Sequence, residues 1–343
     1  MKKNAFYAAA IVVAIFLPFF VYPVFLMKVL CFALFACAFN LLIGYTGLLS
    51  FGHAAFFGGA GYMTGFALKY WNLSLEFGLA AGVLVAIVIG LLMGALAIRR
   101  QGIYFTMITL ALAQMLFFAC LQAPFTGGED GLQGVPRAPL LGLVSTADDR
   151  TLYYVVLGIF VAGFALIMRT IHSPFGQVLK AIKENEPRAI SLGYDVNRYK
   201  LLAFVLSAGI SGLAGATKTA VLGFETLTDV HWTMSGLVVL MTLVGGLGTL
   251  TGPIVGAVVI IALENKLGEI GNGLASLTGI EWFNSLGESV TIVTGLIFIL
   301  CVLAFRRGIV GELGALYQRM SARPAKPAAQ QAVPAARAEV QAP

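Results

Sequence analysis

Long apolar stretches separated by short polar segments run through most of the chain. A membrane-spanning helix needs about 20 apolar residues to cross ~30 Å of hydrocarbon. The pattern predicts an all-α polytopic membrane protein of about ten transmembrane helices. The count is eight to ten if the glycine-rich segments 44–65 and 242–256 re-enter the membrane without crossing it. The predicted spans lie near residues 5–26, 27–47, 51–69, 76–98, 103–121, 151–169, 200–221, 233–250, 252–267 and 289–305.

The overall composition supports a membrane protein. Hydrophobic residues make up 59% of the 343 residues and charged residues 11%, whereas soluble domains carry about 25% charged residues. The mean hydropathy is +0.90. The first apolar stretch looks like a secretory signal, but residues 19–22 are bulky where a cleavage site needs small side chains. We therefore interpret this stretch as an uncleaved first span.

The positions of the basic residues predict the orientation. Cytoplasmic loops carry an excess of Lys and Arg, and placing the N-terminus inside gives that excess to the inner side. We therefore expect both termini to be cytoplasmic. The basic residues form short clusters without a basic stripe, so we expect no nucleic-acid partner. Of the 22 Lys and Arg residues, those left outside are Lys28, Lys69, Arg137, Arg150, Lys218 and Lys266.

Several classes of chemistry are missing from the pattern. His53, His172 and His231 lie in unrelated segments, and the four cysteines lie in apolar stretches without metal-ligand spacing. The segments GGLGTLTG at 245–252 and GATKT at 215–219 lack the spacing of nucleotide-binding motifs. We predict no catalytic residue, no metal and no cofactor in this chain. Glu225, Asp229 and Glu264 lie near predicted span ends, where contact with water would make their charge inexpensive.

The predicted cytoplasmic loop, residues 170–199, carries its own helix signals. Ser173 followed by Pro174 predicts a helix start. Pro187 should end that helix and begin a second one, which Gly193 should terminate. Two short amphipathic helices at the membrane surface could dock into a groove on a cytoplasmic partner. The alternative is a solvated connector.

The glycine-rich segment 40–65 contains polar residues within an apolar stretch. Broken, glycine-rich helices are tolerated in membranes where they line a cavity or are buried in protein. Polar groups inside the bilayer suggest function, so Ser50, Phe51, Gly52, His53 and Phe56 are candidates for a substrate path. Alternatively, His53 forms a hydrogen bond to a neighbouring helix.

These features leave three classes of membrane protein open. An ATP-driven permease subunit would need the loop at 170–199 and a separate ATPase. An ion-coupled transporter would need intramembrane carboxylates, which are scarce here. A membrane enzyme would need a cluster of nucleophile, base or metal ligands, which the pattern does not contain.

Four blocks of the sequence resemble the branched-chain amino-acid ABC transporter permease family, of the LivM type. The resemblance covers about residues 25–310. The blocks are NLLIGYTGLLSFGHAAFFGGAGYMTG (40–65), TGGEDGLQGVP (126–136), SPFGQVLKAIKENEPRAISLGYDVNRYKLLAF (173–204) and LMTLVGGLGTLTGPIVGA (240–257).

The resemblance implies a function, a location and partners. Residues 1–310 would form the permease domain of an importer in the bacterial inner membrane that works by alternating access, and residues 311–343 a cytoplasmic, disordered Ala/Pro-rich tail. The partners would be a different, LivH-type permease, two ATPases that bind ATP and Mg²⁺, a periplasmic binding protein and membrane lipid. The loop at 170–199 would couple to an ATPase. The implied coupling residues are Gly176, Lys180, Glu184, Asn185 and Gly193.

The resemblance also implies a cargo. Leucine, isoleucine and valine follow from the family, but relatives of this permease class carry urea, short amides and other amino acids. The binding protein would do most of the selecting.

Overall fold

The computed structural model describes residues 2–140, 142, 145–278, 295–296, 299 and 308–312. Its regular structure in these ranges is helical, with one isolated β-bridge between Leu132 and Glu225. The prediction of an all-α chain is therefore confirmed. The longer helices are α1 (Lys2–Phe16), α2 (Pro23–Thr46), α3 (His53–Tyr70), α4 (Leu75–Ala97), α5 (Ile103–Gln122), α6 (Asp149–His172), α7 (Pro174–Glu184), α9 (Val196–Leu222), α11 (Trp232–Gly245) and α12 (Gly252–Thr278). The shorter ones are η1 (Leu17–Phe19), η2 (Pro124–Thr126), η3 (Gly128–Asp130), α8 (Glu186–Ser191) and α10 (Leu227–Val230).

Five helices in the described ranges are long and apolar enough to cross a membrane: α2, α4, α5, α6 and α9. Residues 9–19 and α11 form shorter apolar helices. The count of eight to ten spans therefore stays a prediction. The predicted span 289–305 and the predicted tail 311–343 lie outside the described residues, except for residues 295, 296, 299, 311 and 312.

Some predicted span boundaries are wrong. The second span begins at Pro23 and not at 27, because a proline suits the first turn of a helix. The predicted span 233–250 ends at Gly245, and a turn leads into α12. Gly246 and Gly248 in this turn have φ of +122° and +74°, which side-chain-bearing residues rarely adopt. The segment 242–256 is thus a tight corner between two helices.

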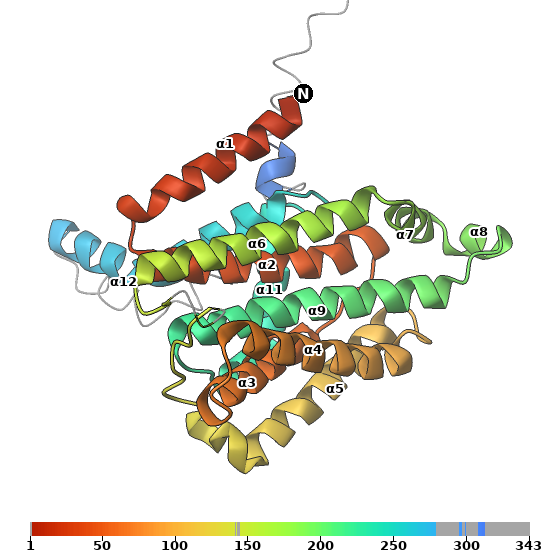
Figure 1. Ribbon diagram of the computed structural model, residues 1–343. Helices are drawn as coiled ribbons and strands as arrows, with labels where there is room; N and C mark the ends of the chain where they lie inside the picture. The colour runs from red at the N-terminus through yellow and green to blue at the C-terminus, as the bar shows by residue number, and fades with distance from the viewer. Residues whose placement is uncertain are drawn as a thin grey trace, which may run out of the picture.

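Helix α9 forms the centre of the bundle. It packs against α2, α3 and α4, and Figure 1 shows it running between the α2–α6 pair and the α3–α4 pair. Small residues allow this close packing. A Cβ atom on Gly212 would lie 2.2 Å from Ala86 Cβ, and one on Gly215 would lie 2.0 Å from the carbonyl oxygen of Phe57. Glycine at helix crossings lets membrane helices approach closely.

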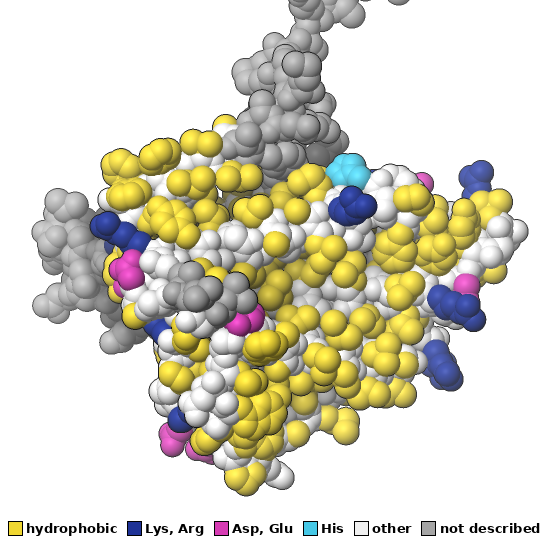
Figure 2. All heavy atoms as spheres, in the orientation of Figure 1, with side chains coloured by type: hydrophobic (Ala, Val, Ile, Leu, Met, Phe, Trp, Pro, Cys, Tyr) yellow, Lys and Arg dark blue, Asp and Glu magenta, His cyan; other side chains and the backbone are white. Residues whose placement is uncertain are grey.

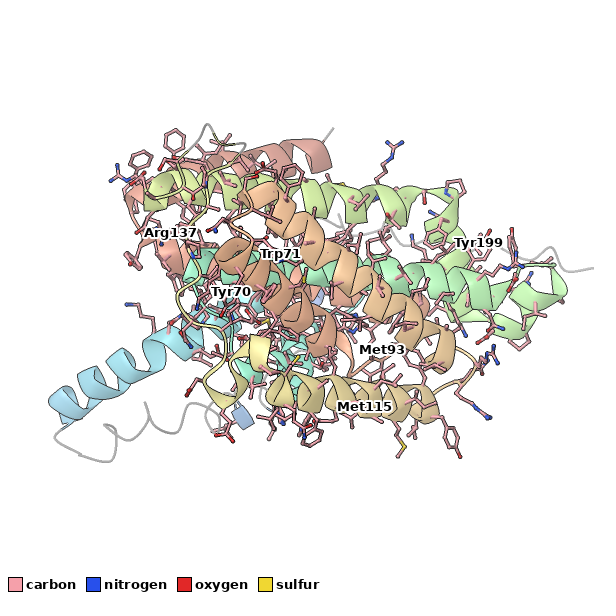
Figure 3. The ribbon with its side chains drawn as sticks, turned by 60° about the horizontal axis from the view of Figure 1, so that its bottom comes forward. Tyr70, Trp71, Met93, Met115, Arg137 and Tyr199 are labelled. Atoms are coloured by element: carbon pink, nitrogen blue, oxygen red, sulfur yellow. The ribbon has the colours of Figure 1, made fainter. Side chains whose placement is uncertain are left out.

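The bundle has two distinct ends. Helices α7 and α8 project beyond one end, called here the α7–α8 end, and the connection between α5 and α6 lies at the other, called the loop end (Figure 1). On the face in Figure 2, hydrophobic side chains cover much of the surface between the ends. Tyr70 and Trp71 are about half exposed at the loop end (Figure 3), as expected for residues at a membrane interface.

Candidate functional site

The corner between α6 and α7 is held by a local cap. The Ser173 hydroxyl accepts a hydrogen bond from the Gly176 N–H at 3.3 Å and donates one to the Thr170 carbonyl at 2.7 Å. Gly176 is buried, and a Cβ atom there would lie 2.4 Å from the Ile171 carbonyl oxygen. The predicted start at Ser173 and Pro174 is confirmed. A residue with a side chain would not fit at position 176, because the start of α7 lies directly against the backbone at the end of α6.

The inner face of α7 anchors the loop to the bundle. Leu179 and Ile182 are fully buried. The Lys183 ammonium donates a hydrogen bond to the Gly44 carbonyl at 2.7 Å, near the end of α2. The half-buried Lys180 places its ammonium 5.8 Å from the centre of the Tyr45 ring. Helix α7 is therefore joined to α2 by packing and by two lysines.

The outer face and the tip of this loop are exposed. Glu184, Asn185 and Gly193 are all exposed. The Asn185 side chain caps α8 by accepting a hydrogen bond from the Arg188 N–H at 3.0 Å, and Gly193 ends the loop with φ of +87°. Two further apolar side chains that we had not singled out, Ile190 and Leu192, are 58% and 69% exposed. Contact of these residues with an ATPase stays a prediction.

Residues 47–52 connect α2 to α3 inside the bundle. The Ser50 hydroxyl accepts a hydrogen bond from the Gly52 N–H at 3.1 Å. Ser235 on α11 ties the segment down, because its hydroxyl donates to the Phe51 carbonyl at 2.8 Å and accepts from the Ala54 N–H at 2.9 Å. Among the candidate path residues, Ser50, Gly52, His53 and Phe56 are buried and Phe51 is half-buried. Their contact with substrate stays a prediction.

His53 links three helices. Its Nε2 atom lies 2.9 Å from the Ser207 hydroxyl on α9, and that hydroxyl lies 2.6 Å from the Ala38 carbonyl on α2. The single hydroxyl proton goes to Ala38, so His53 Nε2 must carry the hydrogen and donate to Ser207. The rings of Phe39 and Phe56 meet the imidazole edge-on at 4.8 and 5.4 Å. His53 thus forms the interhelical hydrogen bond considered above.

Replacing His53 with leucine should be tolerated better than replacing Gly52 with leucine. In His53→Leu, an apolar side chain of similar bulk replaces the imidazole, and Ser207 stays hydrogen-bonded to the Ala38 carbonyl. The free energy of unfolding should therefore fall by only about 1 kcal/mol. At Gly52, a Cβ atom alone would lie 2.7 Å from Met93 Cε and 3.3 Å from the Thr109 carbonyl, so a leucine should cost about 1–3 kcal/mol in overpacking. Thermal unfolding of both purified variants tests this, and equal losses would contradict it.

A buried cluster of charges lies between α9 and α10. The Lys218 ammonium forms ion pairs with Glu225, at 3.3 Å, and with Asp229. All three residues are at most 4% exposed. The Thr219 hydroxyl donates to Glu225, and the Thr226 hydroxyl donates to Asp229 at 2.6 Å. One cation therefore faces two carboxylates, and each carboxylate has a second hydrogen-bond donor.

The same cluster fixes a connecting segment at the loop end. The backbones of Glu225 and Leu132 exchange two hydrogen bonds of 2.9 Å, and the Val135 N–H donates to the Gly223 carbonyl at 2.8 Å. Gly61 on α3 leaves room for the carboxylate, because a Cβ atom there would lie 2.5 Å from Glu225 Cδ. The segment 126–136 is therefore attached through its backbone to the residue that holds Lys218.

This cluster corrects one expectation. Contact of Glu225 and Asp229 with water was expected from their place at a span end, but both side chains are buried. Lys218 is expected on the outer side from the charge count, and it does lie near the loop end of α9, but its side chain is buried. The sequence does contain a signal for this cluster: a single lysine in an apolar stretch is followed by two carboxylates within eleven positions. An isolated charge in a membrane helix needs a partner.

Metal chemistry is not suggested by the described side chains. Within the ranges that the structure covers, no group of three or more His, Cys, Asp or Glu residues is placed to hold a metal ion.

Comparison with known proteins gives a consistent result. The family model described as the branched-chain amino acid transport system / permease component matches residues 23–303. The high-affinity branched-chain amino acid transport system permease protein LivM of Salmonella typhimurium is 26% identical over 288 residues, 76% of this chain and 68% of that protein. LivM of Escherichia coli is 26% identical over 287 residues, with the same coverage. The ribose import permease protein RbsC of Bacillus subtilis is 27% identical over 260 residues, 68% of this chain and 74% of that protein.

Proposed function

This chain belongs to the family of branched-chain amino acid transport system permease components, and on that premise we propose that it carries leucine, isoleucine or valine. It is a permease subunit of an ATP-binding-cassette importer, a multi-pass protein of the inner membrane. The cargo is proposed from the names of the Salmonella and Escherichia relatives. The ribose permease shows that related chains can carry other solutes, so urea, short amides and other amino acids are the alternatives to test.

We propose that the α7–α8 end faces the cytoplasm. Arg169, Lys180, Lys183, Arg188 and Arg198 lie on the helices at this end, and an excess of Lys and Arg is typical of cytoplasmic loops. The complete chain would then have eight to ten spans with both termini inside. Residues 1–310 would form the permease domain, and residues 311–343 a cytoplasmic tail.

The exposed tip of α7 and α8 is the observation that best supports coupling to an ATPase. Ile190 and Leu192 present exposed apolar side chains in the same loop as the exposed, charged Glu184. An amphipathic helical segment of this kind fits a groove on a partner protein. ATP and Mg²⁺ would bind to two partner ATPases, and this chain would carry no cofactor of its own.

A push on α7 would reach the interior through α2. Lys183 donates a hydrogen bond to the Gly44 carbonyl. Gly44 in turn packs closely against Gly248, because a Cβ atom on Gly44 would lie only 3.0 Å from Gly248 Cα. The Asn40 side chain also accepts from the Gly248 N–H and donates to the Thr249 carbonyl, both at 2.9 Å. Movement of α7 would thus shift the turn between α11 and α12 together with α2.

The loop end would receive a periplasmic binding protein. The segment 126–136 is joined to the Lys218 cluster through Glu225, so docking could alter the contacts of α9. The segment 50–56 would contribute to the substrate path, formed together with a second permease of a different, LivH-type kind. Alternating access requires each partner to bind one conformation better than the other.

Uptake of radiolabelled leucine into proteoliposomes tests this proposal. The vesicles would hold this chain, its partner permease and the ATPases, with and without ATP and the binding protein. Leucine uptake that needs both additions supports the proposal. ATPase stimulation by the binding protein without leucine uptake would reject the cargo but keep the importer. Unlabelled isoleucine, valine, urea and ribose as competitors would then define the range of cargo.

A further inference from the structure

A groove lies between the end of α4 and the start of α9, at the α7–α8 end. It encloses about 360 Å³ and combines two kinds of lining. One wall is apolar and includes Ala95, Ile98 and Leu201. The rim is polar and carries Arg99, Asn197 and Arg198.

The rim has an excess of positive charge. In the described part of the chain, no hydrogen bond or ion pair engages the exposed Arg99. Arg198 pairs through Nε with Asp195 at 2.7 Å, but 84% of its side chain is exposed, so its terminal nitrogens remain available. Asp195 also lines the groove, and the two arginines still outweigh it by one charge. Guanidinium groups match the geometry of phosphate oxygens.

The apolar wall belongs to a membrane-spanning helix. Ala95 lies in the last turn of α4, and this helix is one of the five candidate spans. The surface next to the groove is apolar, because Leu92 and Leu96 of α4 and Leu202 of α9 are each 60–62% exposed. Figure 3 shows α4 running from Trp71 at the loop end toward the end where Tyr199 lies. The groove therefore opens where lipid-facing surface meets basic residues.

We propose that this groove binds an anionic phospholipid, with its phosphate between Arg99 and Arg198 and its acyl chain along α4. A soluble phosphate would use the rim but not the apolar wall. An ATPase would account for the polar rim, but exposed leucines along candidate membrane spans are typical of contact with lipid. A lipid satisfies both surfaces, and positive side chains near an anionic leaflet favour such binding.

A lipid at this position would brace the coupling end of the molecule. The groove adjoins a polar junction in which Glu186 of α8 accepts from Gln101 at 2.9 Å and pairs with Lys200 of α9 at 2.7 Å. The junction ties α8 to α9 and to the turn after α4. A phosphate between Arg99 and Arg198 would add a second link between two of these segments, the turn after α4 and the start of α9.

Lipid binding to the full-length chain tests the proposal. Native mass spectrometry would compare the retention of phosphatidylglycerol and phosphatidylcholine by detergent-purified protein. We expect a preference of about tenfold for phosphatidylglycerol in the unaltered chain, and its loss in R99Q/R198Q. The matched control is R100Q/R169Q, which removes two exposed arginines from the same end but outside the groove. The single variant R99Q keeps the ion pair of Arg198 and should lose most of the preference.

Each other outcome contradicts the proposal. Equal retention of the two lipids by the unaltered chain rejects an anionic lipid site. If R100Q/R169Q loses the preference for phosphatidylglycerol equally, the preference comes from the overall positive charge of this end and not from the groove. Displacement of phosphatidylglycerol by millimolar inorganic phosphate would show that the rim binds soluble phosphate. Displacement by the purified ATPase would identify the groove as a protein contact. None of these results depends on the cargo, so the proposed transport function is tested separately.

Discussion

Replacing Lys218 with methionine is expected to lower the free energy of unfolding by about 3–5 kcal/mol. The substitution keeps most of the side-chain volume but leaves Glu225 and Asp229 without their shared cation. Both carboxylates are buried, and an uncompensated buried charge is among the most costly defects in a protein. The Thr219 and Thr226 hydroxyls would still donate to them, but a neutral donor does not balance a charge. We expect the variant to accumulate poorly in the membrane and to lose the attachment of the segment 126–136.

The origin of this effect can be tested by removing all three charges. A chain carrying Lys218→Met, Glu225→Gln and Asp229→Asn should recover most of the lost stability, because buried charges cost much less once none is left unpaired. Lys69→Met is the control. That lysine also lies at the loop end, but it donates to the Gln133 carbonyl and not to a carboxylate. Membrane abundance and thermal unfolding in detergent are the measurements. Failure of the triple variant to recover would show that Lys218 acts through packing alone.

The features that could be predicted from the sequence are those fixed by near neighbours along the chain. The start of α7 depends on Ser173 and Pro174, and the start of α8 on Asn185 and Pro187. The end of the loop depends on the positive φ of Gly193. Each of these signals acts within a few residues. The two helices of the loop at 170–199 could therefore be predicted from the sequence, although the first ends at Glu184, before the predicted break at Pro187.

Long-range pairing explains what could not be predicted. The hydrogen bond of His53 reaches Ser207, 154 positions away, so the sequence left its role open between a substrate path and a helix contact. Glu225 and Asp229 fall at a span end in the pattern, yet the segment after α9 folds back against α3 and buries them. Burial in a membrane protein depends on which helix covers a residue, and hydropathy along the chain does not record this.

Helix length sets a second limit on what the hydropathy pattern can predict. The average hydropathy of residues 233–250 predicts one span, whereas α11 has 14 residues and a length of about 21 Å. That is shorter than the ~30 Å of a bilayer core. Gly246 and Gly248 turn the chain before the apolar stretch is finished. A run of apolar residues thus predicts location in the membrane more reliably than it predicts a complete crossing.

Glu184→Lys is expected to reduce transport strongly while the fold of the permease is kept. Glu184 is the last residue of α7 and is exposed, and its side chain makes no hydrogen bond or ion pair within the described ranges. A positive charge at the C-terminal end of a helix is favourable, so lysine should not weaken α7. At a docking surface, however, reversing a charge places it against the partner's complementary charge, and such mismatches cost several kcal/mol. We expect leucine uptake to fall by about tenfold or more, with normal abundance and normal thermal unfolding.

The assay needs controls that separate the charge from its position. Glu184→Gln removes the charge without reversing it, and should retain more uptake than Glu184→Lys. Gln177→Lys adds a positive charge to another exposed position of α7, and should have the smaller effect if Glu184 itself faces the ATPase. Co-purification of the ATPase with each variant then reports on docking directly. Undiminished uptake by Glu184→Lys at normal abundance would exclude Glu184 from the contact. Loss of uptake with the ATPase still bound would mean that Glu184 transmits the motion after docking, through the α7 helix that Lys183 ties to α2.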